Sequence, residues 1–427
     1  MFMNKINLIL TVALACGLPC EASGQPQPPA KWSRPAGWDK IAADQAALDK
    51  YRCPKPAQFA IVFSWGYATD MFPKDDAQFE QIVVKAKAAG FNVFHTSYTP
   101  ARVSLCRKHG VQLMIDFLDT DNHHVNRLPE KCQAVCKAVE GDPAVWGYNV
   151  WNDHFGGRAE GHERDLRSVR LWDPSHPSYC GCCSNDNDPL LTNADCMGYY
   201  DFHWERGIDL HFVHLLKYLS GCRQYDSCLV TLISGRPTRR HGKSADYLHR
   251  SLWSVNTSIA CGMKGYSWFL APMDAKTLHW TANADHVTKV NLEIVPMATE
   301  LMKIGLPSAV YATKVTKSNE NQPLGGARMP VGLGNNGFPA DFWIQPAGGE
   351  FVMGVFRDER KRDAIFLANY NSQASQDVTL KFGRDIKASL FNRKESKWQP
   401  LAVAGRTLTL KLDAGGGELL RFEPFTL

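Results

Sequence analysis

The sequence predicts an α/β fold, a (β/α)8 barrel followed by a small antiparallel β-sandwich. From residue 57 to 306, apolar strand-like runs alternate with amphipathic helical stretches, the pattern of a parallel sheet covered by helices. From about Ser308 onward, short alternating strands are separated by Gly, Asn and Asp turns, which is typical of antiparallel sheets. The 427 residues, 44% of them hydrophobic, are enough to bury a large core and a smaller second one.

The first 24 residues have the layout of an export signal, because one Lys precedes an apolar run that ends in small residues. Residues 22–24 offer a small-x-small cleavage site, whereas residues 14–16 resemble a lipoprotein box that would anchor the chain through Cys16. We therefore expect an exported protein that is periplasmic, extracellular or lipid-anchored at the cell surface. Residues 25–56 are expected to form a Pro-rich linker and a helix at 39–50.

Eight apolar runs provide the barrel strands expected at 59–67, 91–98, 111–118, 145–153, 177–185, 197–204, 227–235 and 263–272. Helical periodicity is clear in the segments 76–90, 210–221 and 287–305, each of which ends in Gly, as helix ends prefer. The segment between the fifth and sixth strands shows no helical pattern. Because the last helical segment ends at Gly305, the barrel is expected to span 57–306 and the sandwich 307–427.

The sandwich strands follow from period-two alternation between turn residues. They are expected within 309–315, 342–345, 351–371, 377–382, 387–392, 407–412 and 418–425.

Charge and aromatic content bear on the class of ligand. The formal charge of +5, spread over 48 basic and 43 acidic residues, does not indicate nucleic acid. No run beyond the leader reaches the roughly 20 apolar residues of a membrane-spanning helix. Aromatic rings fall at several expected strand ends, where they can stack on sugar faces, and this favours a carbohydrate partner; they are Trp65, Tyr67, Tyr98, Trp151, Trp204 and Trp268.

The segment 144–155, AVWGYNVWNDHF, is the most informative in the chain. A strand-like run ends there in Asn152, Asp153 and His154. Catalytic groups of parallel barrels sit at the carboxyl ends of the strands, so Asp153 is the first candidate for a catalytic carboxylate. The alternative is that Asp153 caps the next helix by accepting hydrogen bonds from its free amides.

This segment resembles the end of the fourth strand in the large clan of (β/α)8 glycoside hydrolases, where Asn followed by Glu closes a strand reading GYxVWNE. The order of barrel and sandwich, with a closing GGGELLRF strand, is similar to many members of that clan. The resemblance implies that Asn152 holds a sugar hydroxyl and that Asp153, which replaces the Glu, protonates the leaving oxygen.

Glycosidic cleavage usually takes a second carboxyl group. In the resembled clan it is a Glu ending the seventh strand, but here that strand continues as LISGRPT and offers Arg236 instead. The sixth strand supplies Asp201, His203 and Glu205 at alternating positions, which on an extended strand point to one side. We expect Asp201, or else Glu205, to be the partner of Asp153. The alternatives are a buried hydrogen-bonding role for Asp201 and a surface ion pair for Glu205.

Further residues are expected to bind substrate. Asp116 lies in the apolar run LMIDFL, and burying it without a partner would cost several kcal/mol, so it must pair with His95, a basic residue or a substrate hydroxyl. The planar fork of Arg236 could bind the carboxylate or sulfate of an acidic sugar. The complete expected substrate-binding set is Trp65, His95, Asp116, Trp151, Asn152, His203, Arg236 and Trp268.

No cofactor or metal is expected. The polar loop residues Asp119, Asp121, His123 and His124 are interpreted as solvated, and the spacing from Cys180 to Cys183 is not that of a zinc site. Two other functions remain open: a catalytically silent carbohydrate-binding barrel, and a metal-dependent hydrolase, although the first strand lacks a His-x-His pair. The sequence contains neither a G-x-S-x-G elbow nor a phosphate-binding Gly-Lys-Ser/Thr loop.

The chain has 13 cysteines, a number that suits an oxidising compartment. We expect bridges between Cys222 and Cys228, between Cys183 and Cys196, and from Cys106 to Cys132 or Cys136.

Overall fold

The computed structural model describes residues 32–64, 73–117, 124–151, 159–182, 193–200, 208–234, 244–274, 277–313 and 338–424. Within the chain, Arg34–Leu427 forms one compact unit.

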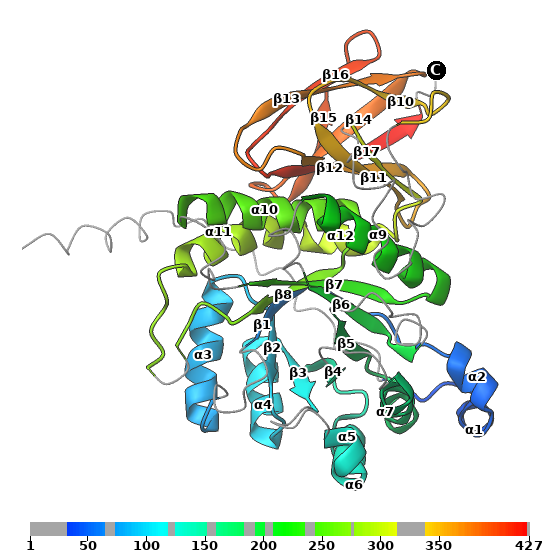
Figure 1. The fold of residues 1–427 in the computed structure, drawn as a ribbon, viewed down its shortest axis with the longest axis vertical. Coiled ribbons are helices and arrows are strands. Elements are labelled where there is room, and N and C mark those ends of the chain that lie inside the picture. The colour runs from blue at the N-terminus through cyan, green and yellow to red at the C-terminus, as the bar shows by residue number, and fades with distance from the viewer. Residues whose placement is uncertain are drawn as a thin grey trace, which may run out of the picture. The chain divides into compact units, whose positions relative to one another are not determined.

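A closed barrel of eight parallel strands forms the first part of this unit and confirms the predicted fold class (Figure 1). The strands follow one another in chain order, and β1 closes the barrel by pairing with β8, with Ala60 opposite Gly265. Their bounds are β1 Ala60–Phe63, β2 Val93–Thr96, β3 Gln112–Asp116, β4 Val145–Trp151, β5 Ser178–Cys182, β6 Cys196–Tyr200, β7 Cys228–Ser234 and β8 Gly265–Phe269.

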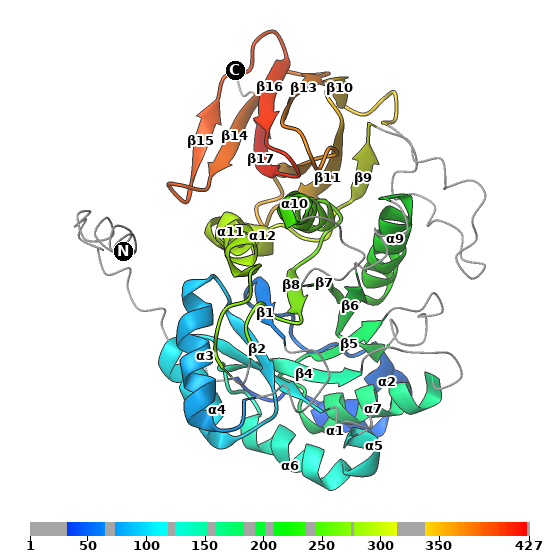
Figure 2. The ribbon, with the colours of Figure 1, turned by 60° about the vertical axis from the view of Figure 1, so that its left-hand side comes forward.

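Helices surround the strands, as the sequence periodicity predicts (Figure 2). Several of their ends are fixed by local chemistry: the Asp75 side chain accepts from the Gln78 amide at the start of α3, and Thr99 does the same for Arg102 in α4. Helix α4 ends at Gly110, whose φ of 62° suits glycine. The bounds are α3 Asp76–Ala88, α4 Pro100–His109, α5 His124–Arg127, α6 Pro129–Val139, α7 Ala159–Trp172, α9 Ile208–Tyr225, α10 Ser244–Ala260, α11 Ala284–Ile294, η3 Val295–Met297 and α12 Ala298–Lys303.

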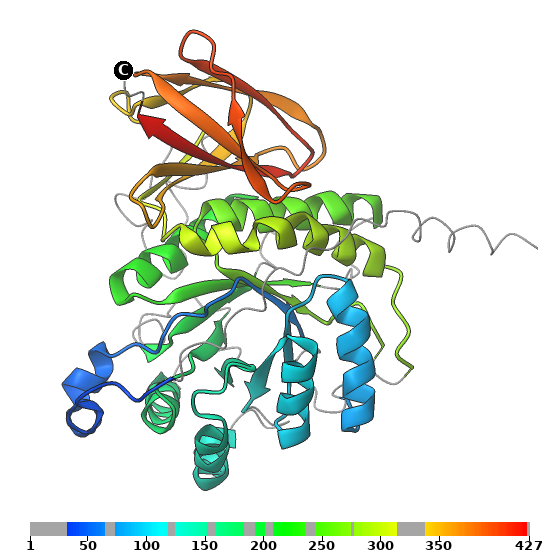
Figure 3. The same cartoon turned by 180° about the vertical axis from the view of Figure 1, so that it is seen from behind.

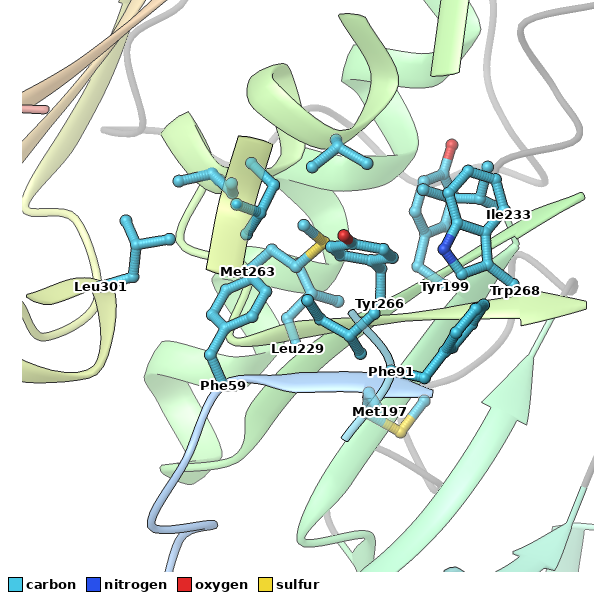
Figure 4. Close-up of a cluster of buried hydrophobic side chains, with 14 of the residues drawn as sticks. Phe59, Phe91, Met197, Tyr199, Leu229, Ile233, Met263, Tyr266, Trp268 and Leu301 are labelled. Carbon is cyan, nitrogen blue, oxygen red and sulfur yellow. The ribbon is translucent and has the colours of Figure 1, made fainter. Parts of the chain in front are cut away.

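Both faces of the barrel sheet are buried, which explains why its strands are apolar along their whole length. Outward side chains pack with the helices in one large cluster, part of which Figure 4 draws, including Tyr199 of β6 with Tyr266 and Trp268 of β8. A separate cluster contains strand residues only and fills the barrel interior. It consists of Ala60, Val62, Val93, Met114, Trp146, Tyr179, Cys196, Cys228, Val230 and Leu232.

The second part is a two-sheet antiparallel sandwich, again as predicted. Six strands pair in the order β15-β14-β17-β12-β11-β9 and three in the order β10-β13-β16, and an apolar cluster centred on residues such as Phe351 and Leu367 fills the sandwich. The bounds are β9 Ala309–Ala312, β10 Ile344–Gly348, β11 Phe351–Arg357, β12 Asp363–Asn369, β13 Gln376–Phe382, β14 Ile386–Asn392, β15 Lys397–Leu401, β16 Thr407–Leu412 and β17 Gly417–Pro424. The predicted domain boundary at 306/307 falls between α12 and β9.

Helices α10 to α12 lie between the barrel strands and the sandwich (Figure 3). The Trp253 indole of α10 donates to the Tyr370 carbonyl at 3.0 Å, and the Asn256 amide donates to the Gly415 carbonyl at 3.0 Å. A Cβ atom on Gly354 would lie only 2.0 Å from the Ala260 carbonyl oxygen, so β11 can approach the end of α10 because this residue is glycine. The sandwich is therefore held to the barrel by hydrogen bonds from α10 side chains to sandwich carbonyls and by the close approach of β11 to the end of α10.

The expected helix at 39–50 is interrupted at one residue. Asp44 is extended, ends α1 (Trp38–Ala43) and accepts at its side chain from the Ala46 and Ala47 amides that start α2 (Gln45–Lys50). An aspartate at this position favours capping over helix continuation. None of the helices in the described ranges combines the length and apolar character that crossing a membrane requires.

Two of the expected disulfides are wrong, because the cysteines involved are free thiols in the structure. Cys222 belongs to the outer cluster and Cys228 to the barrel interior, so the sheet separates their faces. The Cys136 thiol contacts the Tyr148 hydroxyl, and Cys106 and Cys132 are likewise unbridged. The third expected bridge involves Cys183, which lies outside the described residues, as do the predicted leader and Cys16, the candidate lipid-anchor residue.

Candidate active site

Four polar side chains meet inside the barrel at the carboxyl ends of its first four strands. Ser64 directly follows β1, His95 lies in β2, Asp116 ends β3 and Asn149 lies in β4. Asp116 and Asn149 are in-register partners, and His95 lies beside β3 opposite Met114. All four are buried, with exposed fractions of 7% or less. In a barrel of this kind, the carboxyl-end face is where catalytic groups are found.

Hydrogen bonds connect these four side chains in the order Ser64, His95, Asp116 and Asn149. The Ser64 hydroxyl lies 3.0 Å from Nδ1 of His95, and Nε2 of His95 lies 2.9 Å from Oδ1 of Asp116. The Asn149 amide donates to the same carboxylate oxygen at 2.8 Å and lies 3.0 Å from Nε2 of His95. When Nε2 carries the imidazole proton toward Asp116, Nδ1 is an acceptor and the Ser64 hydroxyl donates to it.

The partner of Asp116 is therefore His95, one of the expected choices, with Asn149 as a second donor. Two donors to one oxygen offset the cost of burying the carboxylate. Among the described residues, no hydrogen bond engages the other oxygen, Oδ2. The arrangement holds the Asp116 carboxylate in a fixed orientation through Oδ1.

Trp151 and Trp268 do not contribute rings to this site, which corrects the expectation that they bind substrate. A register shift between Asn149 and Trp151 places an extra residue on β4 relative to β5, and bulges of this kind re-aim side chains. The Trp151 ring lies 3.5 Å from the His162 ring of α7, centroid to centroid. Trp268 is fully buried and donates to Oδ1 of Asn291 in α11 at 2.8 Å.

The remaining predicted site residues lie outside the described residues, and their roles stay predictions: Trp65, Asn152, Asp153, Asp201, His203, Glu205 and Arg236. Sequence reasoning missed Ser64 and Asn149. Both interrupt apolar strand runs, FAIVFS and VWGYNVW, so the signal that singled out Asp116 was present for them too.

The described residues contain no group of three or more His, Cys, Asp or Glu side chains arranged to hold a metal ion. The loop residues Asp119, Asp121 and His123 lie outside the described ranges.

A second buried ionic group lies at the opposite end of the barrel. Arg170 of α7 is fully buried, lies 3.3 Å from Asp195 and donates to the Leu48 carbonyl of α2 at 3.2 Å. Asp195 also accepts from the backbone and hydroxyl of Ser178 at the start of β5. These bonds connect the N-terminal helix α2 to the amino end of the barrel. Polar groups at this end of a barrel contribute to stability.

Comparisons with known proteins identify solved structures that share the fold. No family model matches the chain, and no curated protein matches it. A solved glycoside hydrolase shares its fold with a TM-score of 0.53 at 10% identity, covering 86% of this chain and 93% of that one. A glycoside hydrolase of family 5 from Bacteroides vulgatus does so with a TM-score of 0.53 at 9% identity, covering 86% and 89%. The expected resemblance to (β/α)8 glycoside hydrolases is thus confirmed at the level of the fold.

Proposed function

We propose that the protein is an exported glycoside hydrolase that cleaves a poly- or oligosaccharide at the carboxyl-end face of its barrel. The observation that carries this proposal is the buried network of Ser64, His95, Asp116 and Asn149 at that face. The fold, shared with solved glycoside hydrolases, supports it. Export rests on the sequence of the leader alone.

The reaction is assigned to carboxylates that follow two strands in the sequence. Asp153 stands two residues after the end of β4 and protonates the leaving glycosidic oxygen. Asp201 directly follows β6, and it or Glu205 attacks the anomeric carbon or activates water. A separation of about 5–5.5 Å between the two carboxyl groups would give retention of configuration, and roughly 6.5–9.5 Å would give inversion.

The buried network orients the substrate in this proposal. Oδ2 of Asp116 accepts a hydrogen bond from a sugar hydroxyl, while His95 and Asn149 hold the carboxylate at Oδ1. A fixed acceptor aligns the sugar ring without reorganising during the reaction. Asn152, Trp65, His203 and Arg236 supply further substrate contacts, and Arg236 would favour an acidic sugar.

A substrate panel tests the proposal. Neutral and acidic polysaccharides and aryl glycosides are incubated with the full chain, and release of reducing ends or of the aryl alcohol is measured. Turnover of at least one glycoside is expected. Binding without turnover would instead identify a silent carbohydrate-binding barrel, and turnover abolished by a chelator and restored by a metal ion would identify a metal-dependent hydrolase.

A second candidate function is supported by one observation. Ser64, His95 and Asp116 form the hydroxyl–imidazole–carboxylate chain that activates a serine nucleophile in many hydrolases. Aryl esters in the same panel test this candidate. Ester cleavage that is lost in Ser64→Ala, with no cleavage of any glycoside, would replace the glycosidase proposal.

A further inference from the structure

Two cysteines lie side by side at the amino end of the barrel interior. Cys196 is the first residue of β6 and Cys228 the first of β7, and the two are in-register partners on neighbouring parallel strands. Both side chains belong to the interior apolar cluster, so both point to the same face of the sheet. Their exposed fractions are 0% and 3%.

This placement meets the geometric conditions for a disulfide. Neighbouring strands lie about 4.7–4.9 Å apart, within the roughly 4.4–6.8 Å between Cα atoms that disulfides span. The same spacing exceeds the usual Cβ separation of about 3.5–4.5 Å. A bridge here would draw the strand ends together, and strained bridges of this kind are readily reduced.

The two thiols differ in their surroundings. The hydrogen bond between the thiols and the nearby ammonium groups of Lys264 and Lys55 lower the pKa of Cys228. Burial raises the pKa of Cys196 well above its ordinary value. Cys228 lines a cavity together with Lys55 and Lys264, whose positive charges favour a thiolate there, so Cys228 is the attacking thiol in an exchange.

Cys228 is also reachable from outside the barrel. It lines a cavity of about 520 Å³ at the amino ends of β1, β2, β7 and β8, together with Lys55, Phe59, Lys264 and residues of α12. The Lys264 ammonium donates to the carbonyl of Ile304, which lines this cavity, and to the carbonyl of Leu301. A small disulfide that enters this cavity can therefore reach Cys228. The cavity lies at the amino end of the barrel, away from the carboxyl-end face.

We propose that Cys196 and Cys228 form a reversible disulfide through exchange with a low-molecular-weight disulfide that enters this cavity. The Cys228 thiolate attacks one sulfur of the oxidant, forming a mixed disulfide and releasing one thiolate. Cys196 passes its proton to the thiolate released in the first step, attacks the Cys228 sulfur and releases the second thiolate, which takes up a proton from water. The two protein thiols are oxidised, and the oxidant disulfide is reduced to two thiols.

Titration of the folded, full-length chain with glutathione tests this proposal. The protein is equilibrated at increasing ratios of oxidised to reduced glutathione, quenched by alkylation and digested for mass spectrometry. We expect two thiols to be lost together and a cross-linked peptide pair containing Cys196 and Cys228. Reduction should return both thiols. Cys196→Ser should stop at a mixed disulfide on Cys228, and Cys228→Ser should form neither product.

The matched control is Cys261→Ser, which removes a buried cysteine of the outer cluster and should leave the cross-link unchanged. If a serine variant fails to fold, the alkylation rates of the reduced wild-type chain still test the proposal, because Cys228 should react before the other described cysteines. A bridge from either residue to another cysteine, or thiols that persist under strongly oxidising glutathione, would overturn it. None of these readouts requires glycosidase activity, so the two proposals can fail separately.

Discussion

The two ends of the barrel interior carry different chemistry on the same set of strands. At the carboxyl end, Ser64, His95, Asp116 and Asn149 form a chain of hydrogen bonds. At the amino end, Cys196 and Cys228 lie within an apolar cluster beside a cavity lined by Lys264. Because both groups are buried, burial alone does not identify the catalytic end of the barrel. The carboxyl end holds oriented oxygen and nitrogen ligands suited to sugar hydroxyls, whereas the amino end holds polarisable sulfur suited to redox exchange.

The change in kcat should be largest for the variants that distinguish Asp201 from Glu205 as the partner of Asp153. Asp201→Asn and Glu205→Gln are compared by initial rates on the first glycoside that the wild type cleaves. One of the two should lose roughly 10²–10⁴-fold in kcat, the range of acid–base contributions, and the other much less. Asp226→Asn is the control, because this exposed carboxylate lies at the amino end beside Lys55. Equal, small losses in both variants would remove the sixth strand from the mechanism.

The next effect concerns stability at the carboxyl end. Asp116→Ala leaves the buried donors of His95 and Asn149 without their shared acceptor and should lower the free energy of unfolding by about 3 kcal/mol. Asp116→Asn retains an acceptor oxygen and should cost about 1 kcal/mol. Urea unfolding of the three proteins measures both values. Indistinguishable stabilities would mean that the network does not depend on Asp116.

A pH effect is expected at the amino end. Burial lowers the pKa of Lys264 to about 8, from 10.5. Between these values the unfolded chain binds a proton that the folded chain does not, so this residue makes the free energy of unfolding rise with pH. The contribution is on the order of 3 kcal/mol across the window and is complete above about pH 10.5.

Lys264→Met removes this contribution. The stability of Lys264→Met relative to wild type should therefore fall as the pH increases from 8 to 10.5, measured by urea unfolding at each pH. A difference that is constant across this range would show that the Lys264 ammonium keeps its ordinary pKa in the folded protein.

The smallest effect distinguishes the two candidate functions at the carboxyl end. Ser64→Ala removes one hydrogen bond to His95 and should lower the free energy of unfolding by about 1 kcal/mol. Glycosidase turnover should stay within about tenfold of wild type, a change of 1.4 kcal/mol in the barrier. A complete loss of glycoside turnover would show that the hydrogen bond from Ser64 to His95 is required for the reaction, whereas loss of aryl-ester cleavage in a protein that cleaves no glycoside would identify Ser64 as a nucleophile.

Much of the fold could be predicted from the sequence because barrel strands are buried on both faces and therefore appear as continuous apolar runs. The cost of burying a carboxylate predicted that Asp116 has a partner, but the choice of His95 among the open alternatives, and the second donor Asn149, came from the structure. The orientation of Trp151 could not be predicted, because a bulge in β4 changes which face its side chain occupies. The cysteine pairings failed for a related reason, since closeness in sequence does not reveal that Cys222 and Cys228 lie on different faces of the sheet.

The most direct test of the central claim is the turnover of Asp153→Asn on the glycoside that the wild type cleaves best. We expect kcat to fall by roughly 10²–10⁴-fold while the thermal unfolding midpoint is preserved. Wild-type turnover in Asp153→Asn would contradict the assignment of the acid to the end of β4, and with it the proposed reaction at the carboxyl-end face.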